Sequence, residues 1–266
     1  MKKLFLVLLF VPLVSFGQSA EDLIESGKEK ANLKDYKGAI AQYNKAIEMN
    51  PSITLAYIEK GISKYYLKDY DGAIAQFDLV LELDPDNPKA YAFRGASKNT
   101  LKDYYGAIAD YTKAIEIDPD FAYAYYNRGF SKNNLKDYKG AIADFTKAIE
   151  LDPDFAGAYY NRGSSKDYLK DNKGAIADYT KAIELDPDYA IAYYNRGNSK
   201  NSLKDYYGAI ADYTKAIELK PDFAFYTNRG TSKYNLGDKN GACADFRKAI
   251  SLGSTTNIEW VRSNCN

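Results

Sequence analysis

The sequence contains no histidine, and only two of its 266 residues are cysteines. Without histidine, the Ser/His and Cys/His nucleophile systems are impossible, and the commonest general base and metal ligand are missing. Two cysteines alone cannot complete a structural zinc site. Paired carboxylates would be the remaining catalytic option, but the acidic residues fall at repeated positions typical of helix caps and surface pairs. We therefore expect no metal, no cofactor and no enzymatic activity.

The chain also lacks an excess of charge of either sign, because 36 basic residues balance 36 acidic ones. Nucleic-acid binding depends on clustered positive charge, so nucleic acid is not expected as the main partner. The composition, 45% hydrophobic and 27% charged, is ordinary for a soluble globular protein.

Long hydrophobic runs are missing as well. The one apolar run covers residues 4–14, follows two lysines and is interrupted only by Pro12. It is too short to span a bilayer comfortably, and small residues follow it, which predicts a secretory signal peptide over residues 1–17 with cleavage after Gly17. An uncleaved anchor is the alternative. The expected location is outside the cytoplasm, periplasmic or secreted, with no integral membrane segment after cleavage.

Prolines recur every 34 residues, at positions 51, 85, 119, 153, 187 and 221. The text between them recurs too, as in GAIADYTKAIEIDP and GAIADFTKAIELDP. A fixed period of this length is typical of a solenoid, in which each unit buries its apolar faces against its neighbours.

The repeat also resembles the tetratricopeptide repeat (TPR). When Pro153 is aligned with that family's proline, its other consensus positions fall on Tyr125, Gly129, Ala141, Phe145 and Ala148. The resemblance implies an all-α fold, an α-solenoid wound as a right-handed superhelix of helix-turn-helix repeats. We place seven units at residues 20–53, 54–87, 88–121, 122–155, 156–189, 190–222 and 223–253, followed by a short C-terminal capping helix within 254–266.

Within a unit, the glycine and the capping residues predict how the helices meet and begin. Gly129 lowers helix propensity, by roughly 1 kcal/mol relative to alanine, so we expect the second helix to approach it too closely for a side chain. We expect the aspartate after each proline to cap the next first helix, and Asn87 to do so where Pro88 follows. The aspartates are Asp120, Asp154, Asp188 and Asp222.

Arginine and aspartate occur together when the repeats are compared with one another. Five units have both, whereas the first two have Ser26 and Lys60 for the arginine and glutamine for the aspartate. We infer a structural ion pair between the two helices of a unit, with an arginine row for acidic ligands as the alternative. The pairs are Arg94 with Asp110, Arg128 with Asp144, Arg162 with Asp178, Arg196 with Asp212, and Arg229 with Asp245.

The three most similar units differ mainly along one stripe of their first helix, for example at Phe130 and its counterpart Asn198. In tetratricopeptide proteins this stripe lines the concave groove, where peptides bind. Tyrosine offers rigid contact area there, and asparagine can hydrogen-bond a peptide backbone. The candidate binding residues are Tyr126, Asn127, Phe130, Tyr160, Asn161, Tyr168, Tyr194, Asn195, Asn198 and Asn228.

Three alternatives to that assignment stay open. An exposed stripe can vary without binding anything. The tyrosines can pack sideways on the adjacent unit. Asparagine at this position is also frequent in family members that have no asparagine ladder.

The last unit has Cys243 where the other six have isoleucine, at a position that should face a following unit. No unit follows; instead Thr256 and Glu259 have the spacing of a capping box, which predicts a helix over the open end. In an exported protein, Cys243 and Cys265 suggest a disulfide between the last unit and this helix, with two unpaired thiols as the alternative.

These patterns predict a non-catalytic scaffold that binds a peptide or partner protein in its groove. The alternative is an assembly component of a cell-envelope complex that uses the convex face or the solenoid ends. Neither the partner nor the oligomeric state follows from the sequence.

Overall fold

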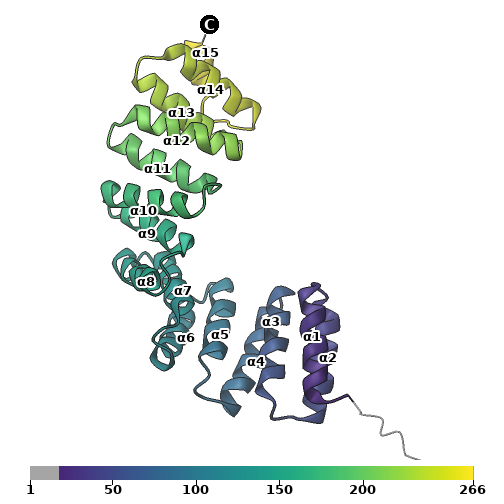
Figure 1. Ribbon diagram of the computed structural model, residues 1–266. Coiled ribbons are helices and arrows are strands. Elements are labelled where there is room, and N and C mark those ends of the chain that lie inside the picture. The colour runs from purple at the N-terminus through teal and green to yellow at the C-terminus, as the bar shows by residue number, and fades with distance from the viewer. Residues whose placement is uncertain (1–17, 266) are drawn as a thin grey trace, which may run out of the picture. The chain divides into compact units, whose positions relative to one another are not determined.

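The computed structural model describes residues 18–265, so the predicted signal peptide lies outside the described residues. Every regular element within that range is an α-helix, and fourteen of the helices form seven consecutive pairs. The first helices of the pairs are α1 (Ala20–Asn32), α3 (Thr54–Tyr66), α5 (Pro88–Thr100), α7 (Ala122–Asn134), α9 (Ala156–Tyr168), α11 (Ala190–Ser202) and α13 (Phe223–Asn235). The second helices are α2 (Tyr36–Met49), α4 (Tyr70–Leu83), α6 (Tyr104–Ile117), α8 (Tyr138–Leu151), α10 (Asn172–Leu185), α12 (Tyr206–Leu219) and α14 (Lys239–Ser251). A short helix, α15 (Ile258–Asn264), completes the described chain (Figure 1).

The described residues form two compact units, one ending at Pro85 and the other beginning at Asp86. The first contains α1–α4 and the second α5–α15. Within the second unit, first helices contact first helices of neighbouring pairs, whereas no two second helices of its described part contact each other. The first helices therefore line the inner side of this stack. The predicted all-α solenoid with a short C-terminal helix is confirmed.

Each turn between the helices of a pair uses the same local chemistry. An aspartate before the second helix accepts a hydrogen bond from a glycine N–H three residues later, as Asp171 does from Gly174 at 2.9 Å. A Cβ on Gly174 would lie 2.2 Å from that carboxylate, so any other residue here would displace the cap. One residue before the aspartate, six of the seven turns hold a lysine in the left-handed region, with φ between 62° and 66°.

The predicted caps of the first helices are right in two places and wrong in three. Asn87 caps α5 and Asp222 caps α13. Asp120, Asp154 and Asp188 do not cap, because four residues separate the helices there and an aromatic residue, Phe121 in the first case, falls at the cap position. Only three residues separate α12 from α13, so Asp222 lies directly before the helix and can cap it.

The predicted close approach at Gly129 is present. A Cβ on Gly129 would lie 2.9 Å from the ring of Phe145, which the second helix presents at this point. Ala124, Ala141 and Ala148 are fully buried, Ala124 in a cluster with the preceding second helix and Ala148 in a cluster with the next first helix. The small residues therefore let the two helices of a pair, and the next first helix, pack without gaps.

Candidate functional site

In the second unit, each of the five helix pairs is held together by one charge cluster. Arg162 donates two hydrogen bonds to the Asp178 carboxylate, at 3.0 and 2.7 Å. The Lys166 ammonium lies 2.7 Å from the same carboxylate, which is buried. The structure places each predicted arginine against its predicted aspartate, and the clusters are Arg94–Asp110–Lys98, Arg128–Asp144–Lys132, Arg162–Asp178–Lys166, Arg196–Asp212–Lys200 and Arg229–Asp245–Lys233.

Four of these arginines, Arg128, Arg162, Arg196 and Arg229, also reach the preceding pair. Arg162 donates from Nη1 to the Thr146 hydroxyl at 3.1 Å, and its guanidinium lies 5.5 Å from the centre of the Tyr159 ring. An arginine with this many contacts inside the protein holds repeats together rather than standing free for an acidic ligand.

Sequence reasoning missed the lysine of each cluster. Its signal was present, because every unit has lysine four residues after the arginine position, which places both on one helix face. The second repeat has Gln76 in place of the buried aspartate, and its lysine, Lys64, instead pairs with the cap residue Asp69 at 2.6 Å.

The predicted tyrosine and asparagine series contact each other across neighbouring pairs. Asn161 donates to the Tyr126 hydroxyl at 2.9 Å, and its neighbours repeat the contact in Asn195 with Tyr160 and Asn228 with Tyr194, both at 3.0 Å. The Tyr126 ring packs against Phe155 at a centroid distance of 4.5 Å. Burial raises the pKa of Tyr126 and of Tyr160.

The tyrosines therefore pack sideways on the next pair, which was the alternative to groove lining. A peptide could use the amide N–H groups of Asn161, Asn195 and Asn228 only by displacing these contacts. Asn127 makes no such contact, because the preceding pair has Ala92, which has no hydroxyl, in place of the tyrosine. It donates instead to the Tyr123 carbonyl of its own helix at 2.8 Å. Asn198 is also engaged, since it accepts from Tyr213 and Asn228 at 2.8 Å each.

Four large side chains remain exposed on the varying stripe of the first helices. They come from α7, α9 and α11, and their exposed fractions are between 37% and 63%: Tyr123, Phe130, Tyr168 and Ile191, here called the groove patch. Phe130 and Tyr168 are predicted binding residues, whereas Tyr123 and Ile191, which share one varying position of the stripe, were not among them. Tyr168 is held in place by stacking on Tyr138, with the ring centroids 4.7 Å apart and the planes 6° apart.

A cavity of about 350 Å³ lies next to Tyr168, between α9, α11 and the start of α10. Its lining includes Ser164, Asp167, Tyr168, Lys170, Tyr179, Asn198 and Ser199. Burial raises the pKa of Asp167, partly offset by hydrogen bonds from Ser199 and Tyr179.

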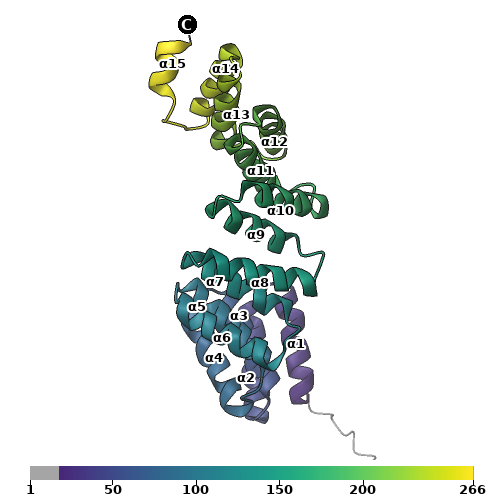
Figure 2. The same ribbon diagram turned by 90° about the vertical axis from the view of Figure 1, so that its left-hand side faces the viewer.

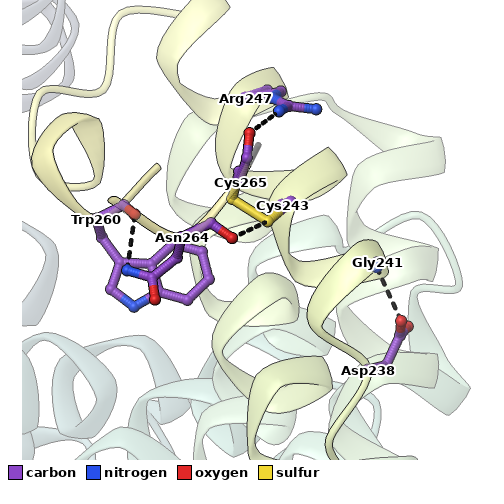
Figure 3. Close-up of a disulfide and its surroundings, with 7 residues drawn as sticks. All are labelled: Asp238, Gly241, Cys243, Arg247, Trp260, Asn264 and Cys265. Carbon is purple, nitrogen blue, oxygen red and sulfur yellow. Dashed lines mark hydrogen bonds between the residues drawn. A yellow bond between two sulfur atoms is a disulfide. The ribbon is translucent and has the colours of Figure 1, made fainter. Parts of the chain in front are cut away.

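The C-terminal helix α15 lies against α14 (Figure 2). Figure 3 shows the disulfide that joins Cys243 of α14 to Cys265 directly after α15, with Arg247 donating to the Cys265 carbonyl. Trp260 packs edge-on against Phe246, with the ring centroids 4.7 Å apart. The Asn257 amide contacts the Thr227 hydroxyl at 3.3 Å, as the asparagine of a following repeat would contact a tyrosine.

The predicted capping box of this helix is wrong. The helix begins at Ile258, so its cap position is Asn257, which makes no side-chain cap bond. Thr256 lies one residue too early and instead contacts the Ser254 hydroxyl at 3.0 Å.

Across residues 18–265, no cluster of three or more Cys, Asp or Glu side chains is arranged to hold a metal ion. In the same range, no helix is both long and apolar enough to cross a membrane.

The helix pairs, the small residues between them and the contacts from pair to pair define an α-helical repeat protein of the helix-turn-helix class. The chain belongs to the tetratricopeptide repeat family. Family models with the description "Tetratricopeptide repeat" match residues 25–88, 122–155, 190–223 and 224–252, and one described as "TPR repeat" matches 100–135 and 168–201. A comparison with curated proteins found no match.

Several solved structures are similar to this chain. MamA shares 31% identity over 59% of this chain and 93% of its own, with a TM-score of 0.58. YrrB, described as a TPR protein with an unusual peptide-binding site, shares 25% identity over 69% of this chain and 94% of its own, with a TM-score of 0.60. A tetratricopeptide repeat protein from Parabacteroides merdae, 22% identical over 94% of this chain and 100% of its own, has a TM-score of 0.66 and shows the fold alone.

Proposed function

We propose that this protein is a non-catalytic scaffold that binds an extended peptide, or an extended segment of a partner protein, on the inner side of α7, α9 and α11. Family membership supports the coarser part of the proposal, because tetratricopeptide repeat proteins bind proteins or peptides. The YrrB structure supports it further, since its description names a peptide-binding site.

The exposed groove patch is the observation that assigns binding to the inner side of α7, α9 and α11. The groove patch exposes three aromatic side chains and one isoleucine at positions where the repeats otherwise differ, so packing does not dictate them. Exposed apolar side chains rimmed by polar groups mark interaction sites, and Phe130 and Tyr168 line one cavity together. Asn133 and Asn134 border this cavity, the second of about 350 Å³, and supply such a polar rim.

The partner is expected outside the cytoplasm. Residues 1–17, which lie outside the described range, have the pattern of a secretory signal, and a disulfide between Cys243 and Cys265 suits an oxidising compartment. The rival function is an assembly role through the convex face or the solenoid ends.

A displayed library of random linear peptides tests the groove. The wild-type protein is compared with a variant in which the groove patch carries serine at all four positions. The matched control is Tyr105→Ser with Tyr207→Ser, because these tyrosines are 76% and 77% exposed but lie at the start of second helices. Circular dichroism confirms that each variant is folded.

Groove binding predicts that the wild type and the control select the same peptides and that the groove-patch variant selects none. If the groove-patch variant selects peptides as well as the wild type does, the groove proposal is wrong. Capture of a protein from an envelope extract that survives the groove-patch substitutions would then favour the assembly role.

A further inference from the structure

In the second unit, one position of the first helix carries a charge in a single pair, a neutral amide in three others and Tyr234 in the last. The charged and amide residues are Asn99, Asn133, Asp167 and Asn201. Each accepts a hydrogen bond from a serine of the next first helix, as Asn133 does from Ser165 at 2.9 Å and Asp167 from Ser199 at 2.8 Å. Because asparagine makes this contact three times, packing does not require a carboxylate at residue 167.

Among the described residues, Asp167 has hydrogen-bond donors but no salt-bridge partner. Ser199 and Tyr179 each supply one hydrogen, at 2.8 to 2.9 Å, to a carboxylate that can accept about four. No lysine or arginine of residues 18–265 forms a salt bridge with it, although Lys170 lines the same cavity and its charge lowers the pKa of Asp167. Asp178, on the next helix, has two cations within 2.7 Å.

The cavity beside Asp167 has the remaining features of a cation site. Tyr168 borders it, and stacking on Tyr138 holds its ring in place. A carboxylate beside an aromatic face attracts an ammonium or guanidinium group through charge and through the ring quadrupole. The hydroxyls of Ser164 and Ser202, which also line the cavity, add neutral acceptors.

We propose that this cavity binds the side chain of a lysine or arginine in the peptide that lies on the groove patch. The inference rests on the proposed function, because it names the residue class that the groove selects. Tyr168 belongs to both the groove patch and the cavity, so one extended segment can contact both.

The test compares peptide selection by the full-length protein, by Asp167→Asn and by Asp171→Asn. Asn is tolerated at residue 167 because Asn133 makes the same serine contact. Asp171→Asn removes an equal charge from an exposed cap outside the cavity, and asparagine is an equally good cap residue. Thermal unfolding confirms that all three proteins are folded.

The wild type and Asp171→Asn should enrich lysine or arginine at one fixed position of the selected peptides. Asp167→Asn should lose that enrichment and bind the best wild-type peptide about tenfold more weakly, the usual loss when a charge-assisted hydrogen bond is removed. The n-butylguanidinium ion should compete with this peptide, whereas its uncharged analogue n-butylurea should not.

Two results overturn the inference and leave the groove intact: peptides selected without a basic residue, or a basic preference that Asp167→Asn retains. If the wild type selects no peptide, or if binding survives the groove-patch substitutions, the proposed function fails together with the inference.

Discussion

Lys102 is one of six lysines that hold a backbone conformation suited to glycine. Its φ is 65°, and it ends the first helix α5 by donating its N–H to the Asn99 carbonyl at 3.0 Å. The last pair has Gly237 in the same place, with φ of 85°. A side chain in this region opposes the conformation by about 1–2 kcal/mol, while glycine adds freedom to the unfolded chain.

Lys102→Gly should therefore stabilise the protein by about 0.5–1 kcal/mol, the difference between these two effects. Urea unfolding followed by circular dichroism measures the change. Lys102→Ala is the matched control and should have no such effect, since alanine keeps the Cβ. Equal gains from both substitutions would locate the effect in the lysine side chain and contradict the backbone explanation.

The charge of Asp167 should also affect the stability of the fold. Burial raises its pKa above the value of an unfolded chain, so the ionised carboxylate opposes folding at neutral pH. This opposition fades as the pH falls through the raised pKa to the ordinary value near 4. Asp167→Asn should be more stable than the wild type at about pH 7, and the difference should vanish near pH 3.

Thermal melts of both proteins across this pH range give the difference directly. Other carboxylates protonate over the same range in both proteins, so only the difference is informative. A wild type that is the more stable protein at neutral pH would show that Asp167 strengthens the fold, which removes one reason for assigning it to a ligand.

The contact between Tyr126 and Asn161 could not have been predicted by comparing repeats. Co-occurrence revealed the arginine and aspartate pairs because the first two units lack both residues. The asparagines show no such dependence, since Asn127 is retained although the preceding pair has Ala92 in place of the tyrosine. Where residues do not vary together, the repeats contain no information about which of them touch.

At the scale of elements, each helix pair of the second unit is joined by one buried charge cluster. We expect Arg162→Met and Asp178→Asn each to destabilise the protein by about 2–4 kcal/mol, because either change leaves charge without its main partner in a buried setting. The double variant should lose less than the sum, with a coupling of about 1–3 kcal/mol in urea unfolding.

Lys166 supplies the control for this cycle. It touches the same carboxylate, so Lys166→Met combined with Asp178→Asn should also show coupling. Because its ammonium is the more flexible and more hydrated cation, that coupling should be the smaller of the two. Additive losses for Arg162 and Asp178 would contradict a structural ion pair.

Helix boundaries were predictable only where their cause is local. The aspartate and glycine of each inner turn are three residues apart and fix the start of the second helix. The start of a first helix depends instead on the number of residues that connect it to the preceding second helix. This connection has three residues before α13 and four before α7, α9 and α11. A cap assigned from the proline alone therefore works for Asp222 and fails for Asp154.

At the scale of the whole molecule, the described chain ends in a helix that stands where another repeat would begin. Disulfide closure between Cys243 and Cys265, 22 residues apart, should stabilise the attachment of α15 by about 3 kcal/mol on the chain-entropy model. Trp260, the one tryptophan of the sequence, reports on this helix through its packing on Phe246.

Reduction should therefore make Trp260 fluorescence shift to longer wavelength at a lower urea concentration than the loss of helical circular dichroism. Cys243→Ser with Cys265→Ser should reproduce this separation without reductant. Thiol titration of the unreduced protein provides the control, and two free thiols would exclude the disulfide. Coincident transitions after reduction would show that the cap needs no covalent attachment.

The site is less predictable than the fold because the fold rests on residues that repeat, whereas the site rests on residues that do not. Gly129 and Ala141 recur in every unit and predict packing. Within the second unit, Tyr168 and Asp167 each occur once in their positions, and their joint access to one cavity follows only from the three-dimensional arrangement.

The contacts between neighbouring pairs of the second unit are interchangeable, so whole repeats can be gained or lost during evolution. Tyr126 meets Asn161 now, and removal of residues 156–189 would present it with Asn195, an identical partner in an identical setting. Unequal recombination between such similar stretches of a gene can therefore add or delete a whole repeat without breaking a contact type. Selection can then lengthen or shorten the inner surface in steps of one repeat, while single substitutions such as the one at Asp167 give individual repeats their own preference.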